Sequence, residues 1–389
     1  MKNALKLVLQ SARDLSTRLL PDRSDKNKYG FAFLVHPRDI RDVYRKYPFL
    51  RLLPVTLLEF FLRWYWPVIL SHVTGLVSRK TGKPIHGFIF TISLTARQMM
   101  ENRACALRKI KQAIILAKKS GAKIIGLGGL TSSLSKGGLD LLGARGINIT
   151  TGHAYTAYNV AQTLLKLADF FGTNRKTAVL ACVGAAGSVG STTAQLLARE
   201  GFTHFILIDR EHKRQQFEHL VAQIQRLNSH AHISLSHRIA DIATADFIVT
   251  TTNAPEAVVH SKDLKHGAVV VDDAQPSDVA PDVLTRGDVL VVEAGVVHTP
   301  DIHNHFNFNL KDRFDNFCCL AEVLILAANE WDKHFVINRA TLELVDRIAA
   351  WGKELGFRVA EFQNFNESIS RERLEKMRGI IQERHELQS

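Results

Sequence analysis

A glycine-rich stretch offers the clearest chemistry in this chain. Residues 177–198 read TAVLACVGAAGSVGSTTAQLLA, an apolar run that breaks at glycines and resumes with helical apolar spacing. A strand that turns through glycines into a helix presents backbone N–H groups to an anion and lets the chain approach a pyrophosphate. The alternative is a glycine turn that serves packing alone. The expected dinucleotide contacts in this turn are Gly184, Ala185, Gly187, Ser188, Val189 and Gly190.

Cys319 is the most consequential candidate nucleophile. It lies in FCCLAE, residues 317–322, where an apolar helical pattern begins. The dipole at a helix N-terminus stabilises a thiolate, and a thiolate is a strong nucleophile. Periodicity alone favours buried packing roles for Cys318 and Cys319. His298 follows the last strand pattern and is the imidazole that we expect to act as acid or base.

Residues after two further strand patterns bear on the choice of cofactor. Asp209 ends one strand pattern, where a carboxylate can accept hydrogen bonds from a ribose 2′-hydroxyl, which favours NAD. Arg210 and Arg214 follow it and offer positive charge to a 2′-phosphate, although they are also typical of an exposed helix start. Thr251 ends another strand pattern and Thr252 follows it, and both should line the nicotinamide crevice.

The spacing of the strand patterns indicates the fold that positions these residues. Apolar strand patterns recur at residues 178–183, 205–208, 232–235, 247–251, 268–272 and 289–292. Helical patterns separate several of them, which predicts a parallel sheet with helical crossovers. We therefore expect an α/β protein with a doubly wound, Rossmann-type parallel sheet, an N-terminal α/β substrate domain and a C-terminal helical segment.

The order of the patterns predicts five parts along the chain. They are a basic arm (1–30), a substrate-binding domain (31–174), a dinucleotide-binding domain (175–300), a helical segment with the nucleophile (301–366) and a charged helical tail (367–389). The tail balances basic against acidic residues, which is typical of a solvated helix.

Charge and apolar residues are concentrated near the N-terminus. The net charge is +12, and residues 1–51 hold twelve Lys/Arg against five Asp/Glu. Residues 52–70, LLPVTLLEFFLRWYWPVIL, follow directly and are interrupted by charges and prolines, which argues against a membrane-crossing helix. They form either a core helix pair or a surface for a membrane or an acyl chain. Basic charge beside aromatics suits anionic lipid or an acidic carrier protein better than nucleic acid.

Cysteine usage points to a reducing compartment. The four cysteines show no metal-ligand spacing, so we expect free thiols and no metal site. The N-terminus lacks the uninterrupted apolar core of a secretory signal. We expect a cytoplasmic protein with peripheral membrane contact as an option.

Several segments in order resemble the long-chain acyl-[acyl-carrier-protein] reductases of cyanobacterial type. The matching stretches lie at residues 81–87, 127–132, 150–158, 183–191, 245–249, 294–297 and 317–322 and in the region of residues 330–331. The resemblance implies NADPH-dependent reduction of a fatty acyl thioester to a fatty aldehyde, with Cys319 as nucleophile. The family loop usually reads Gly-Ala-Thr-Gly-Asp-Ile-Gly-Ser, from which Ala186, Ser188 and Val189 depart. Asp209 replaces a neutral residue of the family, so NADH stays an alternative.

These observations lead to one expected function and two alternatives. We expect a fatty acyl thioester, carried by acyl carrier protein or coenzyme A, to be reduced through a cysteinyl acyl-enzyme. In the stretch 150–158 the expected substrate contacts are Thr151, His153, Tyr155 and Tyr158. The first alternative is a direct NAD(P)-dependent dehydrogenase of a small hydroxy or amino acid, similar to shikimate dehydrogenases. The second is a nucleotide-sensing protein of the membrane surface.

Overall fold

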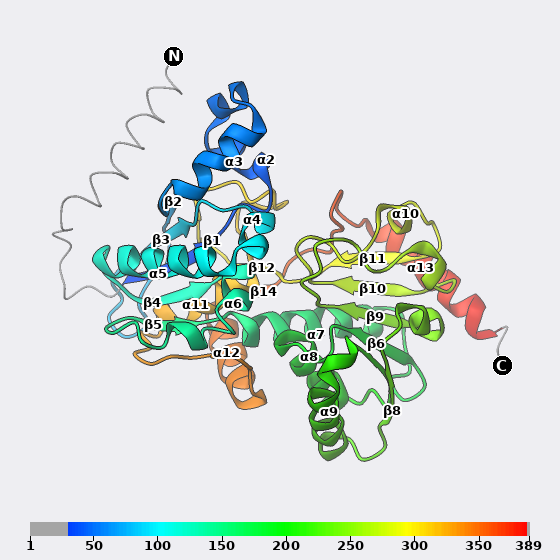
Figure 1. Ribbon diagram of the computed structural model, residues 1–389. Helices are drawn as coiled ribbons and strands as arrows, with labels where there is room; N and C mark the ends of the chain where they lie inside the picture. Colours follow the sequence, from blue (N-terminus) through cyan, green and yellow to red (C-terminus); the bar gives the residue numbers. More distant parts are fainter. Residues whose placement is uncertain (1–29, 387–389) are drawn as a thin grey trace. The chain divides into compact units, whose positions relative to one another are not determined.

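The computed structural model describes residues 30–386 and divides the chain into two compact units. Unit 1 takes the chain up to Gly152 together with Thr299–Asn338. Unit 2 takes His153–His298 and the chain from Arg339 onward. The basic arm predicted over residues 1–30 lies, except for Gly30, outside the described residues. Figure 1 shows the elements of both units along the chain.

Unit 1 is built on a five-stranded sheet. Its strands, in spatial order, are β2 (Val68–Val73), β3 (His86–Thr91), β1 (Gly30–Val35), β4 (Ala122–Leu127) and β5 (Asn148–Thr150). β1 runs parallel to β3 and β4, and β4 runs parallel to β5, whereas β2 is antiparallel to β3. The carboxyl ends of four strands therefore share one edge of this sheet.

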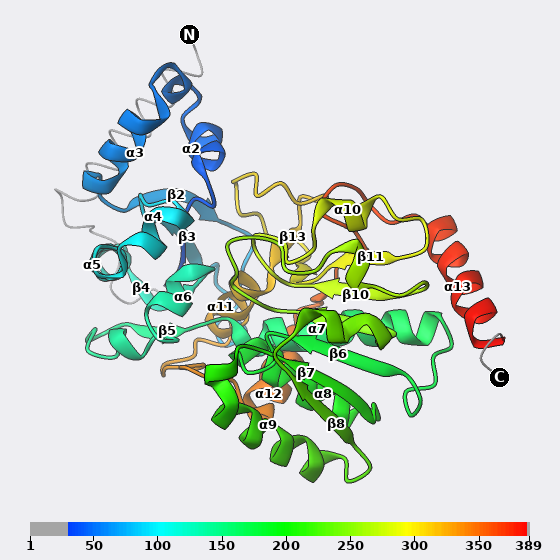
Figure 2. The ribbon, with the colours of Figure 1, turned by 45° about the vertical axis from the view of Figure 1, so that its right-hand side comes forward.

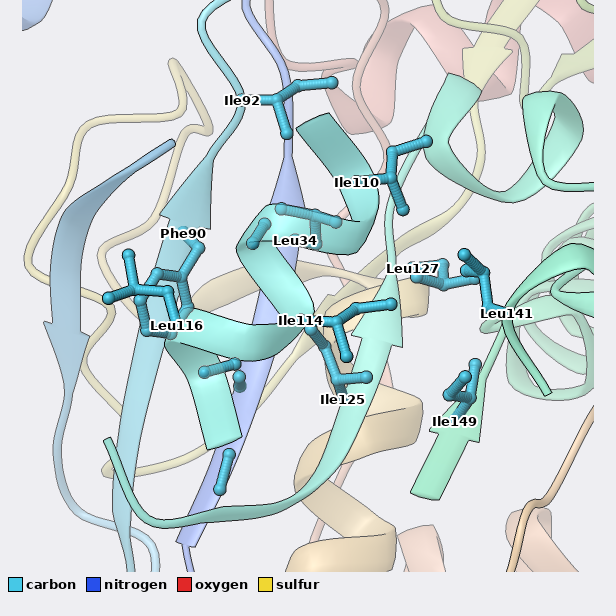
Figure 3. Close-up of a cluster of buried hydrophobic side chains, with 14 of the residues drawn as sticks. Leu34, Phe90, Ile92, Ile110, Ile114, Leu116, Ile125, Leu127, Leu141 and Ile149 are labelled. Carbon is cyan, nitrogen blue, oxygen red and sulfur yellow. The ribbon is translucent and has the colours of Figure 1, made fainter. Parts of the chain in front are cut away.

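Helices cover both faces of the unit 1 sheet. Side chains alternate along β1, so Leu34 joins the apolar cluster beneath α5 (Arg103–Lys119), drawn in Figure 3. On the opposite face α11 (Cys318–Ala328) packs against β1 and β4. A Cβ at Gly126 of β4 would lie only 3.0 Å from Val323 Cβ, so the glycine lets this helix approach closely.

An arm of three short helices precedes β2 and extends beyond that edge of the sheet in Figures 1 and 2. It consists of α2 (Ile40–Lys46), η1 (Pro48–Leu52) and α3 (Val55–Trp64). Its small core is formed by Val43, Leu58 and Leu62. Residues 52–70 are thus no helix pair, because the segment ends in the buried strand β2. Within residues 30–386, no helix has the length and apolar character needed to span a bilayer.

The remaining elements of unit 1 are short. They are α4 (Ala96–Glu101), α6 (Leu130–Leu134), η2 (Leu139–Leu141) and β13 (Asp315–Phe317).

Unit 2 contains the predicted doubly wound sheet. Its six parallel strands are, in spatial order, β11 (Leu290–Glu293), β10 (Val269–Asp272), β9 (Phe247–Thr250), β6 (Val179–Val183), β7 (His204–Ile208) and β8 (His232–Ser236). Read along the chain, this is the 3-2-1-4-5-6 order of the Rossmann fold. The prediction is confirmed, and each strand end lies within one residue of its expected position.

Helices and short turns complete unit 2. They are α7 (His153–Phe170), α8 (Ser188–Arg199), η3 (Glu211–Lys213), α9 (Arg214–Leu227), η4 (Ile239–Thr244), η5 (Ser261–Asp263), α10 (Pro281–Leu284), α12 (Leu342–Glu354) and α13 (Arg371–Glu386). β12 (Val296–His298) pairs antiparallel with β14 (Arg358–Val359).

The unit boundaries differ from the predicted domain boundaries. α7, expected in the substrate domain, joins unit 2 because it packs against α8 and α12. The predicted helical segment 301–366 is divided, since α11 packs on the unit 1 sheet while α12 packs in unit 2. The tail is helical but not fully solvated: Met377 is buried and Arg384 binds the Asp246 carboxylate at 2.5 Å.

Candidate functional site

The glycine turn of unit 2 has the geometry that the sequence predicts. Gly184 has a φ of +83°, which disfavours any residue with a side chain. A Cβ at Gly190 would lie 2.5 Å from the Gly184 carbonyl oxygen and 2.7 Å from Thr251 Oγ1. Both glycines are therefore required for α8 to start directly above the end of β6.

The first turn of α8 is open to an anion. Gly187 is its N-cap and supplies no side chain to cap the N–H groups of the first turn. Arg339 adds positive charge here, because its Nη2 donates to the Ala186 carbonyl at 2.9 Å and its Nη1 to Ser191 Oγ at 3.3 Å. Uncapped N–H groups, a cradle of glycines and a guanidinium fit the pyrophosphate of a dinucleotide.

Asp209 is already engaged within the fold. Its carboxylate accepts hydrogen bonds from the N–H groups of Ala186 at 3.0 Å and Arg210 at 2.8 Å. Lys213 Nζ also donates to it at 3.1 Å, and the Asp209 side chain is only 5% exposed. Arg210 and Arg214 are exposed beside it. The negative charge of Asp209 is therefore compensated, whereas positive charge faces solvent at the end of β7.

The two predicted threonines follow β9 but differ in their contacts. Thr251 donates its N–H to the Val183 carbonyl at 3.0 Å and so closes the glycine turn from the side of β9. Thr252 donates its N–H and hydroxyl to Asp278, at 2.9 and 2.5 Å. Thr251 is thus part of the turn, and Thr252 belongs to an acidic cluster next to it.

This acidic cluster lies at the carboxyl ends of β10 and β11. Burial and the neighbouring Asp272 raise the pKa of Asp278 to about 6. Burial and three nearby carboxylates raise the pKa of Asp273 well above its usual range. A Cβ at Gly295 would lie 2.1 Å from Asp273 Oδ1, so glycine is required there. The sequence predicted that this loop lies at the site, but it did not predict carboxyl groups with raised pKa values.

The other predicted residues of unit 2 lie on α7 and β12. His298 ends β12 opposite Arg358. Burial of the His153 imidazole, at the start of α7, lowers its pKa to about 4, which keeps the ring neutral. Tyr155 is buried, and its ring lies 5.7 Å from that of Tyr158, which is partly exposed.

In unit 1, Cys319 lies in the first turn of α11 and is partly exposed. No side chain caps this helix start, so its N–H groups favour negative charge on the sulfur. A Cβ at Gly152 would lie 2.4 Å from Cys319 Cβ and 2.5 Å from its Cα. The chain beyond β5, which includes Thr151, therefore passes directly against the cysteine.

Glu322 holds that segment in place. It lies one turn after Cys319 on α11 and is fully buried. Its carboxylate accepts hydrogen bonds from the Thr150 hydroxyl and from the Gly152 N–H, the latter at 3.0 Å. Sequence reasoning assigned Glu322 no role. The signal was available, since a lone glutamate inside an apolar helical run must find buried donors.

The remaining cysteines differ from Cys319. All four are free, as predicted. Burial raises the pKa of Cys182 to about 12, so this thiol stays protonated. Cys318 is buried, whereas Cys105 is partly exposed in the first turn of α5. Cys319 thus combines exposure, a helix N-terminus and an anchored neighbouring loop.

Sequence comparisons agree with a nucleotide-binding reductase scaffold. The family described as shikimate / quinate 5-dehydrogenase matches residues 166–294. The long-chain acyl-[acyl-carrier-protein] reductase of Synechococcus elongatus is 29% identical over 308 residues, which cover 75% of this chain and 87% of that protein. The glutamyl-tRNA reductase of Lawsonia intracellularis is 23% identical over 264 residues, 63% of this chain and 58% of that protein. The chain is related to reductases.

A further relative and a solved structure complete the comparisons. Aminotransferase PigE of Serratia sp. is 24% identical over 306 residues, which span 77% of this chain but only 35% of PigE. Quinate dehydrogenase from Corynebacterium glutamicum in complex with NAD is 12% identical, with a TM-score of 0.33, and the match covers 92% of this chain and all of that one.

Proposed function

We propose that this protein reduces a fatty acyl thioester to a fatty aldehyde, with Cys319 as nucleophile and NADPH as hydride donor. The observation that carries the proposal is the setting of Cys319: a partly exposed thiol in an uncapped helix turn, pressed against a loop that Glu322 anchors. Similarity to the cyanobacterial reductase supports the substrate class.

The first half-reaction belongs to unit 1. The Cys319 thiolate attacks the thioester carbonyl, a carbon–sulfur bond forms, and the carbonyl oxygen becomes negatively charged. N–H groups at the start of α11 are placed to stabilise charge in this region. When the carbonyl re-forms, the bond to the carrier breaks, and the carrier thiolate leaves and takes up a proton. The acyl group then remains on Cys319 as a thioester.

The second half-reaction needs two electrons and a proton. Bound NADPH would supply hydride to the acyl carbon, with its pyrophosphate at the 184–190 turn. The resulting thiohemiacetal collapses to an aldehyde when its carbon–sulfur bond breaks, which restores the Cys319 thiolate. We assign to His298, beyond the end of β11, the proton that the thiohemiacetal oxygen gains after hydride transfer and returns when the carbonyl re-forms. We assign the substrate contacts to Thr151 of unit 1 and to His153, Tyr155 and Tyr158 of unit 2.

The choice of NADPH follows from the charges at the end of β7. Asp209 is occupied by two backbone N–H groups and Lys213, so its charge is balanced. Arg210 and Arg214 are exposed beside it, and Arg214 lies 3.5 Å from Glu218 in an exposed ion pair with which a 2′-phosphate would compete. NADH is the alternative donor, because Asp209 also stands where a ribose hydroxyl would bind.

Mass spectrometry of the intact chain tests covalent catalysis. Incubation with palmitoyl-coenzyme A or palmitoyl-acyl carrier protein, without nucleotide, should add one acyl group to the peptide that contains Cys319. Cys319→Ala should lose both the adduct and aldehyde formation while NADPH still raises its melting temperature. Cys105→Ala is the matched control, since that thiol also lies in a helix first turn. Normal aldehyde formation by Cys319→Ala would refute the acyl-enzyme.

The rival function is a direct dehydrogenase of a small hydroxy or amino acid. The match of residues 166–294 to the shikimate / quinate 5-dehydrogenase family favours it. It predicts no acyl adduct and NAD(P)⁺ reduction by small acids that is unaffected by Cys319→Ala. The same set of variants therefore separates the two functions.

A further inference from the structure

The helical arm of unit 1 has an apolar surface that the proposed chemistry does not use. Half of the exposed large apolar side chains among the described residues fall in residues 49–64. We call the following side chains the α3 patch: Phe49, Leu52, Leu57, Phe60, Phe61 and Trp64. Trp64 is 76% exposed and Phe60 56%.

The sequence of α3 places most of this patch on one face of the helix. Leu57, Phe60, Phe61 and Trp64 follow the three- and four-residue spacing that aligns side chains along a helix. The core of the arm uses another stripe, formed by Leu58 and Leu62. α3 therefore has two apolar stripes, and only one of them is covered within residues 30–386.

The charges of the arm suit an anionic surface. Residues 38–64 contain six Lys/Arg and three Asp/Glu. Asp42 is neutralised by Arg38 at 3.0 Å and Arg45 at 2.9 Å, and Glu59 is paired with Arg97 at 2.6 Å.

Three further basic side chains of the arm are exposed to solvent. Arg41 is 86% exposed, with the Asp39 carboxylate 3.9 Å away, and Arg63 is 58% exposed, with the Glu101 carboxylate 3.4 Å away. Arg51 lies over the ring of Tyr44, 5.8 Å from its centroid. The excess positive charge thus lies on the same three helices as the α3 patch.

We infer that the α3 patch docks on an anionic phospholipid surface. Aromatic side chains beside arginines are typical of the bilayer interface, where rings enter the headgroup region and cations meet lipid phosphates. α3 has ten residues, about 15 Å, which suits a helix lying in the interface plane. A second copy of the chain would bring the same positive charge against itself.

Vesicle binding by the full chain tests this inference. The probe is vesicles of equal parts phosphatidylcholine and phosphatidylglycerol, with phosphatidylcholine alone as comparison. The intact protein should co-sediment with the mixed vesicles, and the triple variant Phe60→Ser, Phe61→Ser, Trp64→Ser should bind at least tenfold more weakly. Arg51→Ala should weaken binding about fivefold on mixed vesicles and have no effect on neutral ones.

A matched variant controls for the loss of apolar surface in general. Leu139→Ser, Leu142→Ser, Leu235→Ser removes three exposed leucines outside the patch and should bind like the intact chain. Trp64 is one of four tryptophans, so its own emission is the difference between the spectra of the intact chain and Trp64→Phe, and it should shift to shorter wavelength with mixed vesicles. Trp64→Phe should lose that shift but still bind.

Three results would overturn the inference. Equal binding by the patch triple variant and the intact chain would place the lipid contact elsewhere. Equal binding to vesicles with and without phosphatidylglycerol would show that charge does not contribute to binding. Self-association in sedimentation velocity without lipid, abolished by the patch triple variant, together with no vesicle binding, would show that a second copy covers the patch. Unchanged melting of the variants establishes that they are folded.

Discussion

Gly152→Ala is the sharpest test of how the loop beside Cys319 is built. Gly152 has a φ of +82°, and an added Cβ would lie 2.4 Å from Cys319 Cβ. Because the Cα of Cys319 would also be only 2.5 Å away, a change of side chain at position 319 cannot relieve the overlap. Either the 150–152 segment or the start of α11 must move.

The expected magnitude has two parts. A non-glycine residue in the left-handed region costs about 1–2 kcal/mol. Forcing an extra methyl group into a packed site costs about 1–3 kcal/mol more. Gly82→Ala isolates the first part, because Gly82 has a φ of +69° and no heavy atom within 4 Å of its added Cβ. Gly152→Ala should therefore lower the free energy of unfolding by about 2–5 kcal/mol, and Gly82→Ala by about 1–2 kcal/mol.

The assay combines urea unfolding with acylation of Cys319. Cys319 should be acylated about 100-fold more slowly in Gly152→Ala, since moving a positioned nucleophile by about 1 Å lowers the reaction rate by that factor. Gly82→Ala should acylate at the normal rate. If Gly152→Ala matches Gly82→Ala in both stability and acylation rate, the close approach of Gly152 to Cys319 does not exist in solution.

Three further predictions concern the buried glutamate, the cofactor and pH. Glu322→Leu removes the acceptor of the Thr150 hydroxyl and the Gly152 N–H, so the free energy of unfolding should fall by about 2–6 kcal/mol. Glu322→Gln keeps a carbonyl acceptor, so its free energy of unfolding, measured in urea, should fall by less. Arg210→Ala with Arg214→Ala should raise the Kd for NADPH at least tenfold and leave that for NADH unchanged in calorimetry; an equal change in both would refute the 2′-phosphate contact. The pKa of Asp278 is about 6 in the fold against 3.8 unfolded, so the folded state binds this proton more tightly and stability should fall as pH rises from 4 to 6. Asp278→Asn should remove that slope, and an unchanged slope in chemical unfolding would contradict the assignment.

Local patterns predicted the fold of unit 2 well. Each buried parallel strand is an apolar run between turn residues, and helical spacing fills the intervals, so periodicity suffices. The secondary structure of residues 52–70 was harder to predict, because a short apolar run does not distinguish a helix from a buried strand. Here Val68 begins β2, and only residues 55–64 form the helix.

The site was predictable where its residues are close in sequence. The turn from Gly184 to Gly190 follows from glycine spacing and its strand–helix context. Arg339, by contrast, reaches the Ala186 carbonyl from more than a hundred residues away, and no local pattern marks it. The same limit applies to Glu322. Its partners Thr150 and Gly152 precede residues 153–298 of unit 2 in the sequence, whereas Glu322 follows them.

The sequence by itself determined the strands, the glycine turn and the position of Cys319 at a helix start, because propensity, periodicity and capping act over a few residues. Only the tertiary structure decided that residues 299–338 return to unit 1, that α11 covers β1 and β4, and that Gly152 lies against Cys319. Those contacts depend on side-chain packing and on finding partners for buried polar groups across long stretches of chain, and neither is encoded in a local pattern.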